Sequence, residues 1–168
     1  LNKNSLNQKF RIINNDTKLM PFSFGGHPAF NIHSIDDYDI QFECEEDIKA
    51  NTLEGPYIKE TLIVVIQGNK ISLDKNIFNQ DALIFQDLKS NWVKLAHKSS
   101  THEVKLTITD FPHLGIWSKP GAPFVCIEPW QGMADYVSHN KDILQKKGIL
   151  TLERNDEVTK SFTMEFNS

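Results

Sequence analysis

Arginine and long apolar runs are scarce in this 168-residue sequence. Only two of its 18 basic residues are arginines, and 22 acidic residues give a formal net charge of −4. Two-point contacts to phosphates and base edges favour arginine, so we expect no nucleic-acid partner. The longest apolar runs, such as 62–66, are much shorter than the ~20 residues of a membrane-spanning helix. No signal-peptide pattern opens the sequence, so we expect no membrane partner.

Cysteine is almost as scarce, with Cys44 and Cys126 far apart and no C-x-x-C pair. Two free thiols suit a reducing compartment, which predicts a cytoplasmic protein; one long-range disulfide is the alternative. Metal-ligand spacing is also missing, because His97 and His102 lie five residues apart without a third ligand. We therefore expect no metal site.

What the sequence does contain is short apolar stretches, many with a period of two. Residues 104–109 alternate apolar and polar side chains, as expected of a half-buried antiparallel strand. Residues 67–70 predict a tight hairpin between two such stretches. Short strands at roughly 8–12-residue spacing predict an all-β sandwich or barrel, and the length favours a single domain over 1–168. Helical signal is weak and limited to a turn or two in 135–147. The predicted strands are 9–14, 39–43, 61–66, 70–73, 82–85, 92–97, 103–109, 115–118, 124–128, 149–153 and 161–166.

His27 is the first candidate for chemistry. It follows Gly25-Gly26, precedes Pro28, and has phenylalanines on both sides. Paired glycines permit a tight backbone path, and Pro28 holds His27 in an extended conformation. Histidine exchanges protons near neutral pH, with a reference pKa of ~6.5. The alternative interpretation is a loop histidine that caps nearby backbone.

Glu128 is the second candidate. In the stretch 124–128, Val125 and Ile127 are predicted to face one side of the strand, and Cys126 and Glu128 the other. Burying a carboxylate in so apolar a strand costs free energy unless it has a partner. We expect Pro129 to end the strand, which places Glu128 at a sheet margin; the alternative is a solvated glutamate.

Trp130 follows Glu128 after a single residue. Its indole offers a flat apolar surface of the kind that stacks on sugar rings, and the alternative is a core tryptophan. His27, Glu128 and Trp130 are therefore the candidates that the residues themselves suggest.

Several of these stretches resemble the aldose 1-epimerase (galactose mutarotase) family, in particular its LacX-like branch. In order and approximate spacing they cover nearly the whole chain. The stretches are PFSFGGHPAF at 21–30, NQDALIF at 79–85, DFPHLGIW at 110–117, CIEPWQGMAD at 126–135 and GILTLE at 148–153.

The resemblance implies an antiparallel β-sandwich of the galactose mutarotase type, a supersandwich, that binds a small-molecule aldohexose. It implies that His27 is the general acid on the ring oxygen and that Glu128 is the general base on the C1 hydroxyl. It further implies that Asp81 matches a sugar-hydroxyl-binding aspartate, the alternative being a strand-start cap. No metal or organic cofactor is needed for such a reaction.

The resemblance covers roughly the C-terminal half to two-thirds of the family's domain, so we expect this chain to be N-terminally truncated. An arginine and a second histidine of the family's site would lie upstream. Missing strands would leave sheet edges exposed, and we expect self-association through them. Two alternatives to an active mutarotase follow: a non-catalytic carbohydrate-binding sandwich, and a fragment that works only with the missing N-terminal half. A phosphorylated hexose is less attractive as a substrate because arginine is so rare.

Overall fold

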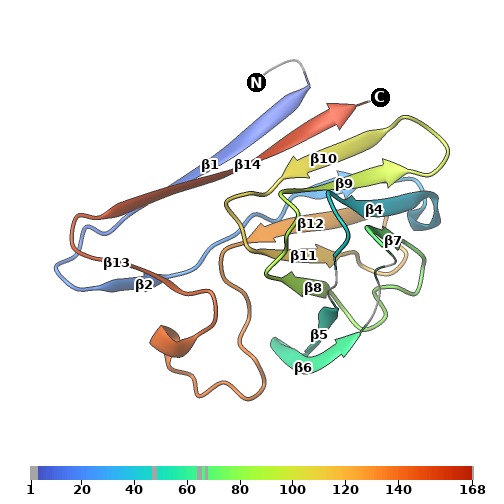
Figure 1. Cartoon of the computed structure of the whole chain (residues 1–168). Coiled ribbons are helices and arrows are strands. Elements are labelled where there is room, and N and C mark those ends of the chain that lie inside the picture. The colour runs from blue at the N-terminus through green and yellow to red at the C-terminus, as the bar shows by residue number, and fades with distance from the viewer. Residues whose placement is uncertain (1–3, 47–48, 64–65, 67, 168) are drawn as a thin grey trace.

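The computed structural model describes residues 4–46, 49–63, 66 and 68–167, and it is built almost entirely of strands (Figure 1). Helical structure among these residues is limited to two short 3₁₀ turns, η1 (Ile35–Asp37) and η2 (Ile143–Gln145). None of the helical segments is long and apolar enough to cross a bilayer. The strands are β1 (Ser5–Ile13), β2 (Met20–Phe22), β3 (Ala29–Asn31), β4 (Tyr38–Phe42), β5 (Ala50–Glu54), β6 (Tyr57–Ile63), β7 (Lys70–Ser72), β8 (Leu83–Gln86), β9 (Trp92–His97), β10 (Glu103–Thr107), β11 (His113–Trp117), β12 (Phe124–Trp130), β13 (Leu150–Leu152) and β14 (Glu157–Asn167).

The described strands form two six-stranded antiparallel sheets and one small pair. One sheet has the order β1-β14-β10-β9-β4-β7, the other β3-β12-β11-β8-β5-β6, and β13 pairs with β2. The predicted all-β antiparallel class is therefore confirmed. The predicted hairpin through 67–70 is wrong, because β6 pairs with β5 whereas β7 pairs with β4 in the other sheet. Residue 67 itself lies outside the described residues.

Most predicted strands coincide with observed ones, and 92–97 matches β9 in full. The strands that the sequence pattern missed are β2, β3 and β5. The first two have only three residues, too few to show a period, and β5 places polar Asn51 and Thr52 in buried positions. Part of the predicted strand 61–66 falls on residues 64 and 65, which are not described.

Strand β12 continues through Pro129 to Trp130, so the prediction that Pro129 ends it is wrong. In an antiparallel ladder the N–H and C=O of one residue point to the same neighbour. The Pro129 carbonyl accepts from the Gly26 N–H at 2.9 Å, so the missing N–H faces the loop that carries His27 and not β11. The ladder with β11 is therefore unbroken, and Leu114 pairs opposite Pro129.

The main core lies between the two six-stranded sheets and receives side chains from both. Val125 and Ile127 of β12 belong to it, as the alternation predicted. One core shared by both sheets supports the proposal that residues 1–168 belong to a single domain. Its fully buried large side chains include Phe42, Phe85, Phe162, Ile40, Ile71, Leu73, Leu83, Leu106, Ile108 and Leu114.

A chain of aromatic rings connects this core to the segment that carries His27. Phe24 lies 5.2 Å from Phe10 and 5.7 Å from Phe111 between ring centroids, and Phe111 lies 5.9 Å from Phe162. A Cβ atom at Gly26 would lie 2.5 Å from the Phe162 ring. The backbone just before His27 therefore rests directly on a core aromatic, and only glycine fits there.

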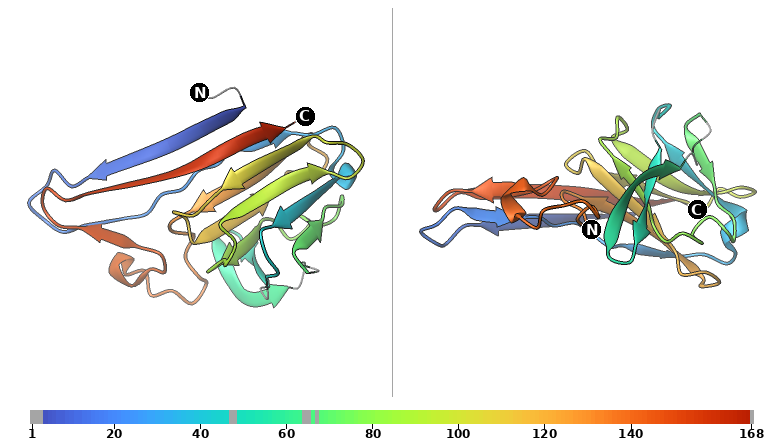
Figure 2. Two further views of the ribbon diagram at one scale, coloured as in Figure 1. Left: turned by 45° about the horizontal axis from the view of Figure 1, so that its top comes forward. Right: turned by 90° about the horizontal axis from the view of Figure 1, so that it is seen from below.

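Strands β2 and β13, together with the halves of β1 and β14 that lie beyond the pairing with β10, extend away from the other strands as a narrow arm (Figures 1 and 2). β1 lies at the edge of its sheet, paired with β14 from Ser5–Glu165 to Ile13–Glu157. Its outer edge has no partner strand within the part of the chain that the structure describes. Self-association through such edges stays a prediction.

We predict that Phe162→Ala lowers the free energy of unfolding by about 3–5 kcal/mol, because a large buried ring is replaced by a cavity. Phe166 provides a matched control in the same strand, since it is 42% exposed whereas Phe162 is 1% exposed. Phe166→Ala should cost about 1 kcal/mol or less. Urea unfolding followed by circular dichroism measures both values, and equal losses would contradict the assigned core.

Candidate active site

Two segments far apart in sequence meet at one face of β12 to form the candidate site. Cys126 and Glu128 alternate with the core residues of β12 and point away from the main core, as predicted. The loop before β3 runs alongside β12. It is attached to β12 by the Gly26 N–H, which donates to Pro129, and by the Pro28 carbonyl, which accepts from Ile127 at 3.2 Å.

Close packing fixes this loop next to β12. A Cβ atom at Gly25 would lie 2.5 Å from the Trp130 Cδ1 atom and 2.8 Å from the Pro129 carbonyl oxygen. Gly25 also forms a β-bridge with Trp130. The two glycines before His27 are thus required by close approach to β12 and to the core, and they place His27 over the strand.

His27 and Glu128 lie side by side. The His27 Nε2 atom is 3.5 Å from the Glu128 Oε1 atom. The two side chains differ strongly in solvent access, because His27 is 64% exposed and Glu128 only 6%. An accessible imidazole therefore contacts a buried carboxylate.

Burial is the main influence on the Glu128 carboxyl and raises its pKa above the usual glutamate value. The positive charge of His27 and the Trp130 side chain act in the opposite direction, because both favour the ionised form. Burial, followed by the charge of Glu128, also raises the pKa of the Cys126 thiol to about 11. The Cys126 thiol therefore stays protonated at neutral pH and is a poor nucleophile.

Trp130 forms one wall of an open pocket above the pair. A Cβ atom at Gly115 would lie 2.5 Å from the Trp130 ring, so the indole lies flat across β11 and cannot move toward the sheet. The pocket has a volume of about 390 Å³. It is lined by Ser23, Phe24, Gly25, Gly26, His27, Glu128, Trp130, Gly132, Met133 and Ala134. Three of the four predicted site residues thus share one cavity.

Asp81, the fourth predicted site residue, does not line this pocket. It is exposed, has a positive φ of 70°, and accepts a hydrogen bond from the Ala82 N–H at 2.8 Å. That contact corresponds to the alternative of a cap at the start of a strand. Its binding to a sugar hydroxyl stays a prediction.

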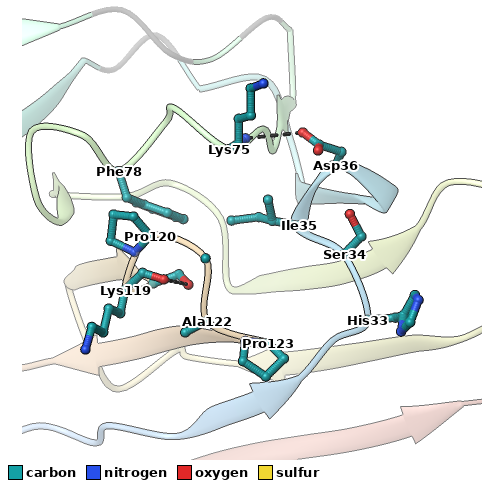
Figure 3. A pocket seen from close by; sticks show the side chains of 12 residues that line it. His33, Ser34, Ile35, Asp36, Lys75, Phe78, Lys119, Pro120, Ala122 and Pro123 are labelled. Atoms are coloured by element: carbon teal, nitrogen blue, oxygen red, sulfur yellow. Dashed lines mark hydrogen bonds between the residues drawn. The ribbon is translucent and has the colours of Figure 1, made fainter.

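A second pocket of about 250 Å³ lies near η1, away from the candidate pair. Figure 3 shows the side chains of Ile35 and Phe78 facing each other across it, next to Pro120. The Lys75 backbone N–H donates to the Asp36 carboxylate at 3.2 Å at its rim. None of the four predicted site residues lines this pocket, and its centre is apolar.

A third pocket, of about 630 Å³, is polar. Here the Gln86 side-chain N–H donates to Asn51 at 2.7 Å, and Lys147 donates to the Gln86 oxygen at 2.6 Å. Tyr136 completes this network. Lys147 also lies 3.3 Å from the Asp87 carboxylate. The charged pair among the described lining residues of this pocket is therefore lysine with aspartate, whereas the first pocket joins histidine and glutamate.

His113, in the stretch 110–117, lies in β11 and is buried. Burial lowers its pKa, which favours the neutral ring. It pairs with Trp130 in the ladder but does not line the pocket. Ser23 and the stretch 132–134 also line the pocket, although the local motifs do not single them out. Ser23 comes two residues before Gly25, and residue 132 comes two residues after the end of β12, so closeness in sequence is the signal that could have found them.

Comparisons with known proteins agree on one family. A sequence model described as aldose 1-epimerase matches residues 1–151. The plasmid-encoded protein LacX of Lactococcus lactis is 28% identical over 173 residues, which cover 96% of this chain and 58% of LacX. The chromosomal LacX protein of the same organism matches equally well.

Solved structures agree with this comparison. A galactose mutarotase-like protein from Lactobacillus casei superposes with a TM-score of 0.89 at 29% identity, covering 99% of this chain and 60% of that protein. A galactose mutarotase related enzyme from Lactobacillus acidophilus has a TM-score of 0.90 at 28% identity, covering 100% and 59%. This chain therefore spans less than two-thirds of the length of these relatives.

We predict that Glu128→Gln stabilises the fold near neutral pH. Burial raises the pKa of Glu128, so the folded state binds this proton more tightly than the unfolded chain does, and ionisation above the unfolded value destabilises the folded protein. The neutral amide avoids that loss. The gain should shrink as the pH falls toward ~4.3, the ordinary glutamate value, because the wild-type carboxyl is then protonated as well.

Urea unfolding at several pH values tests this prediction, with Glu46→Gln as a matched control. Glu46 is also buried, but its carboxylate accepts hydrogen bonds from the Ser90 N–H at 2.7 Å and the Ser90 hydroxyl at 2.6 Å. Removing that charge weakens both bonds and should destabilise the protein. A loss of stability in Glu128→Gln at every pH would show that Glu128 carries no unfavourable buried charge.

Proposed function

This chain belongs to the aldose 1-epimerase family, and from that premise we propose that it interconverts the α and β anomers of an aldohexose such as galactose or glucose. The observation that carries the proposal is the 3.5 Å contact between His27 Nε2 and Glu128 Oε1 at an open pocket. Because the chain spans only part of its relatives' length, this activity is proposed for the chain and not transferred from them.

Anomer exchange needs one proton removed and one proton supplied at neighbouring oxygens. The proton leaves the C1 hydroxyl, a second proton is added to the ring oxygen, and the C1–ring oxygen bond breaks to give a free aldehyde. Rotation of the aldehyde and closure on its other face produce the other anomer. Both oxygens are bonded to C1, so the acid and the base must be neighbours, as His27 and Glu128 are.

Glu128 is suited to the role of base. Its burial fixes the carboxylate, and its raised pKa makes it a better proton acceptor than an ordinary glutamate once it is ionised. The positive charge of His27 lowers the pKa of Glu128 and so partly offsets the effect of burial, which leaves more of this carboxyl ionised. A buried carboxylate also has less contact with water than an exposed one, so the bound sugar is the proton donor that it meets.

His27 is suited to the role of acid because it is accessible and directed at the same pocket. Its imidazole reaches the pocket from the loop opposite β12, so a sugar can lie with its C1 hydroxyl near Glu128 and its ring oxygen near Nε2. When the ring closes, the roles reverse and the protons return. The cycle uses proton transfers alone, so the proposal requires no metal and no organic cofactor.

We propose that Trp130 binds the sugar within this pocket by stacking on it. Its indole is fixed between Gly25 and Gly115, and an immobile aromatic face binds an apolar sugar face at low entropic cost. Asp81 is proposed as a partner for a sugar hydroxyl. Two free cysteines, Cys44 and Cys126, support the proposal that the protein works in the reducing cytoplasm.

A non-catalytic carbohydrate-binding role is the second candidate function. It is favoured by the fact that this chain spans 58% of LacX, which therefore has further residues outside the matched part. A fragment that needs an N-terminal half is a variant of this case. Binding without turnover distinguishes these alternatives from a mutarotase.

We predict that the purified chain accelerates the mutarotation of freshly dissolved α-D-glucose or α-D-galactose, measured by polarimetry. His27→Ala and Glu128→Ala should each lower kcat by about 10²–10⁴-fold, because each removes one positioned proton-transfer group. His102→Ala and Glu54→Ala are matched controls, since both side chains are exposed and lie outside the pocket. Both controls should keep wild-type rates.

Sugar binding, measured by Trp130 fluorescence or calorimetry, completes the experiment. A folded chain that binds sugar but accelerates nothing would support the binding-only role. Restored turnover on addition of the N-terminal part of a LacX-like relative would support the interpretation that this chain is a fragment that needs that part. Full activity in either alanine variant would exclude the acid–base pair.

The pH dependence of kcat/KM should report on Glu128. The base must be ionised, so the rate falls as the pH drops below its pKa, by about tenfold per pH unit. Burial raises that pKa, and the acidic limb should therefore lie above the ~4.3 of an ordinary glutamate. A polarimetric pH series tests this, and a limb at or below the ordinary value would contradict the assignment of Glu128 as base.

A further inference from the structure

Cys126 takes no part in the proton transfers proposed above, yet it lies in the same cluster as the pair. One ligand atom each from His27, Cys126 and Glu128 lies within 4.8 Å of the other two. Cys126 is 1% exposed and Glu128 is buried beside it on the same face of β12. An imidazole nitrogen, a thiol sulfur and a carboxylate oxygen thus lie close to one another.

The spacing of His27 and Glu128 already suits a tetrahedral metal ion, and the Cys126 sulfur lies within 4.8 Å of both. Zinc lies about 2.3 Å from sulfur, about 2.0–2.1 Å from imidazole nitrogen and about 2.0–2.2 Å from carboxylate oxygen. Ligands at those distances are about 3.3–3.7 Å apart in a tetrahedron. The His27 Nε2 to Glu128 Oε1 distance of 3.5 Å lies in this range. His27 is exposed, so its ring can rotate to complete the geometry while β12 holds the other two ligands.

The ligand set also favours one class of cation. Thiolate and imidazole select zinc and similar soft or borderline ions, whereas Mg²⁺ and Ca²⁺ prefer sites made only of oxygen. The pocket of about 390 Å³ above the cluster leaves room for a fourth ligand such as water. We propose that His27, Cys126 and Glu128 form a Zn²⁺-binding site and that its occupancy inhibits the enzyme.

Inhibition follows from the identity of the ligands and rests on the proposed function. A Glu128 oxygen bound to Zn²⁺ cannot accept the C1 proton, and a His27 nitrogen bound to Zn²⁺ cannot donate to the ring oxygen. Binding releases the Cys126 thiol proton to solvent and oxidises nothing. Zinc and sugar would therefore compete for the same two side chains.

Cobalt(II) provides a direct test of the site that does not depend on activity. The reduced whole chain titrated with Co²⁺ should develop a near-ultraviolet thiolate-to-cobalt charge-transfer band and the visible bands of tetrahedral Co²⁺. Zn²⁺ should displace it and Mg²⁺ should not. Cys126→Ser should abolish the thiolate band and weaken Zn²⁺ binding by about 100-fold or more, since loss of a ligand costs at least as much as loss of its supporting groups.

Cys44→Ser is the matched control, because Cys44 is the other free cysteine. Its sulfur lies 3.8 Å from the Glu46 carboxylate, but among the described residues it belongs to no group of three possible metal ligands. This variant should keep the thiolate band. Tetrahedral Co²⁺ without a thiolate band, or equal Zn²⁺ affinity in Cys126→Ser and wild type, would overturn the proposed site.

Polarimetry then tests the inhibition separately. Zn²⁺ should raise the apparent KM of the wild type and of Cys44→Ser, while Cys126→Ser should remain active and lose this sensitivity. Cobalt binding in a chain without mutarotase activity would confirm the metal site and overturn the proposed function. Activity that Zn²⁺ leaves unchanged, in a chain without a cobalt spectrum, would overturn the metal site and leave the mutarotase standing.

Discussion

The carboxylate of Glu128 is held away from water on β12, next to the edge strand of its sheet, and the candidate site is organised around that burial. An isolated buried carboxylate is unfavourable, and here the compensation comes from the His27 imidazole 3.5 Å away. The same burial raises the pKa of Glu128 and turns an ordinary acid into a good base. We propose that this loss of stability serves the acid–base chemistry of the pocket, a trade-off that is common at active sites.

The position of His27 depends on packing that reaches deep into the sandwich. The loop before it is hydrogen-bonded to Pro129 through the Gly26 N–H and rests on Phe162, and the contact with Phe162 requires glycine at position 26. Phe162 belongs to β14, which pairs with β1 and β10 in the opposite sheet. The two sheets thus fix opposite sides of the acid–base pair, with β12 holding Glu128 and β14 supporting the loop of His27. A supporting structure of this kind is what a site needs to hold two groups at a fixed distance.

The sequence was sufficient for the all-β class, for most strands, and for the alternation that separates Val125 and Ile127 from Cys126 and Glu128. Pairing across sheets was out of its reach, because β6 and β7 are close in sequence yet belong to different sheets. Pro129 was misjudged because its missing N–H faces a loop and not a strand, which no local pattern reveals. The candidates His27, Glu128 and Trp130 were found from local motifs, but their meeting in one pocket depends on the register between 25–28 and β12.

The most direct test of this account is a carbon-13 NMR titration of the Glu128 side-chain carboxyl in the wild type and in His27→Ala. Burial and the charge of His27 act in opposite directions on this group. We therefore predict a pKa above the ordinary glutamate value of ~4.3 in the wild type and a still higher value in His27→Ala. An ordinary pKa that is the same in both proteins would contradict the coupling of a buried base to an exposed acid, on which the proposed mechanism rests.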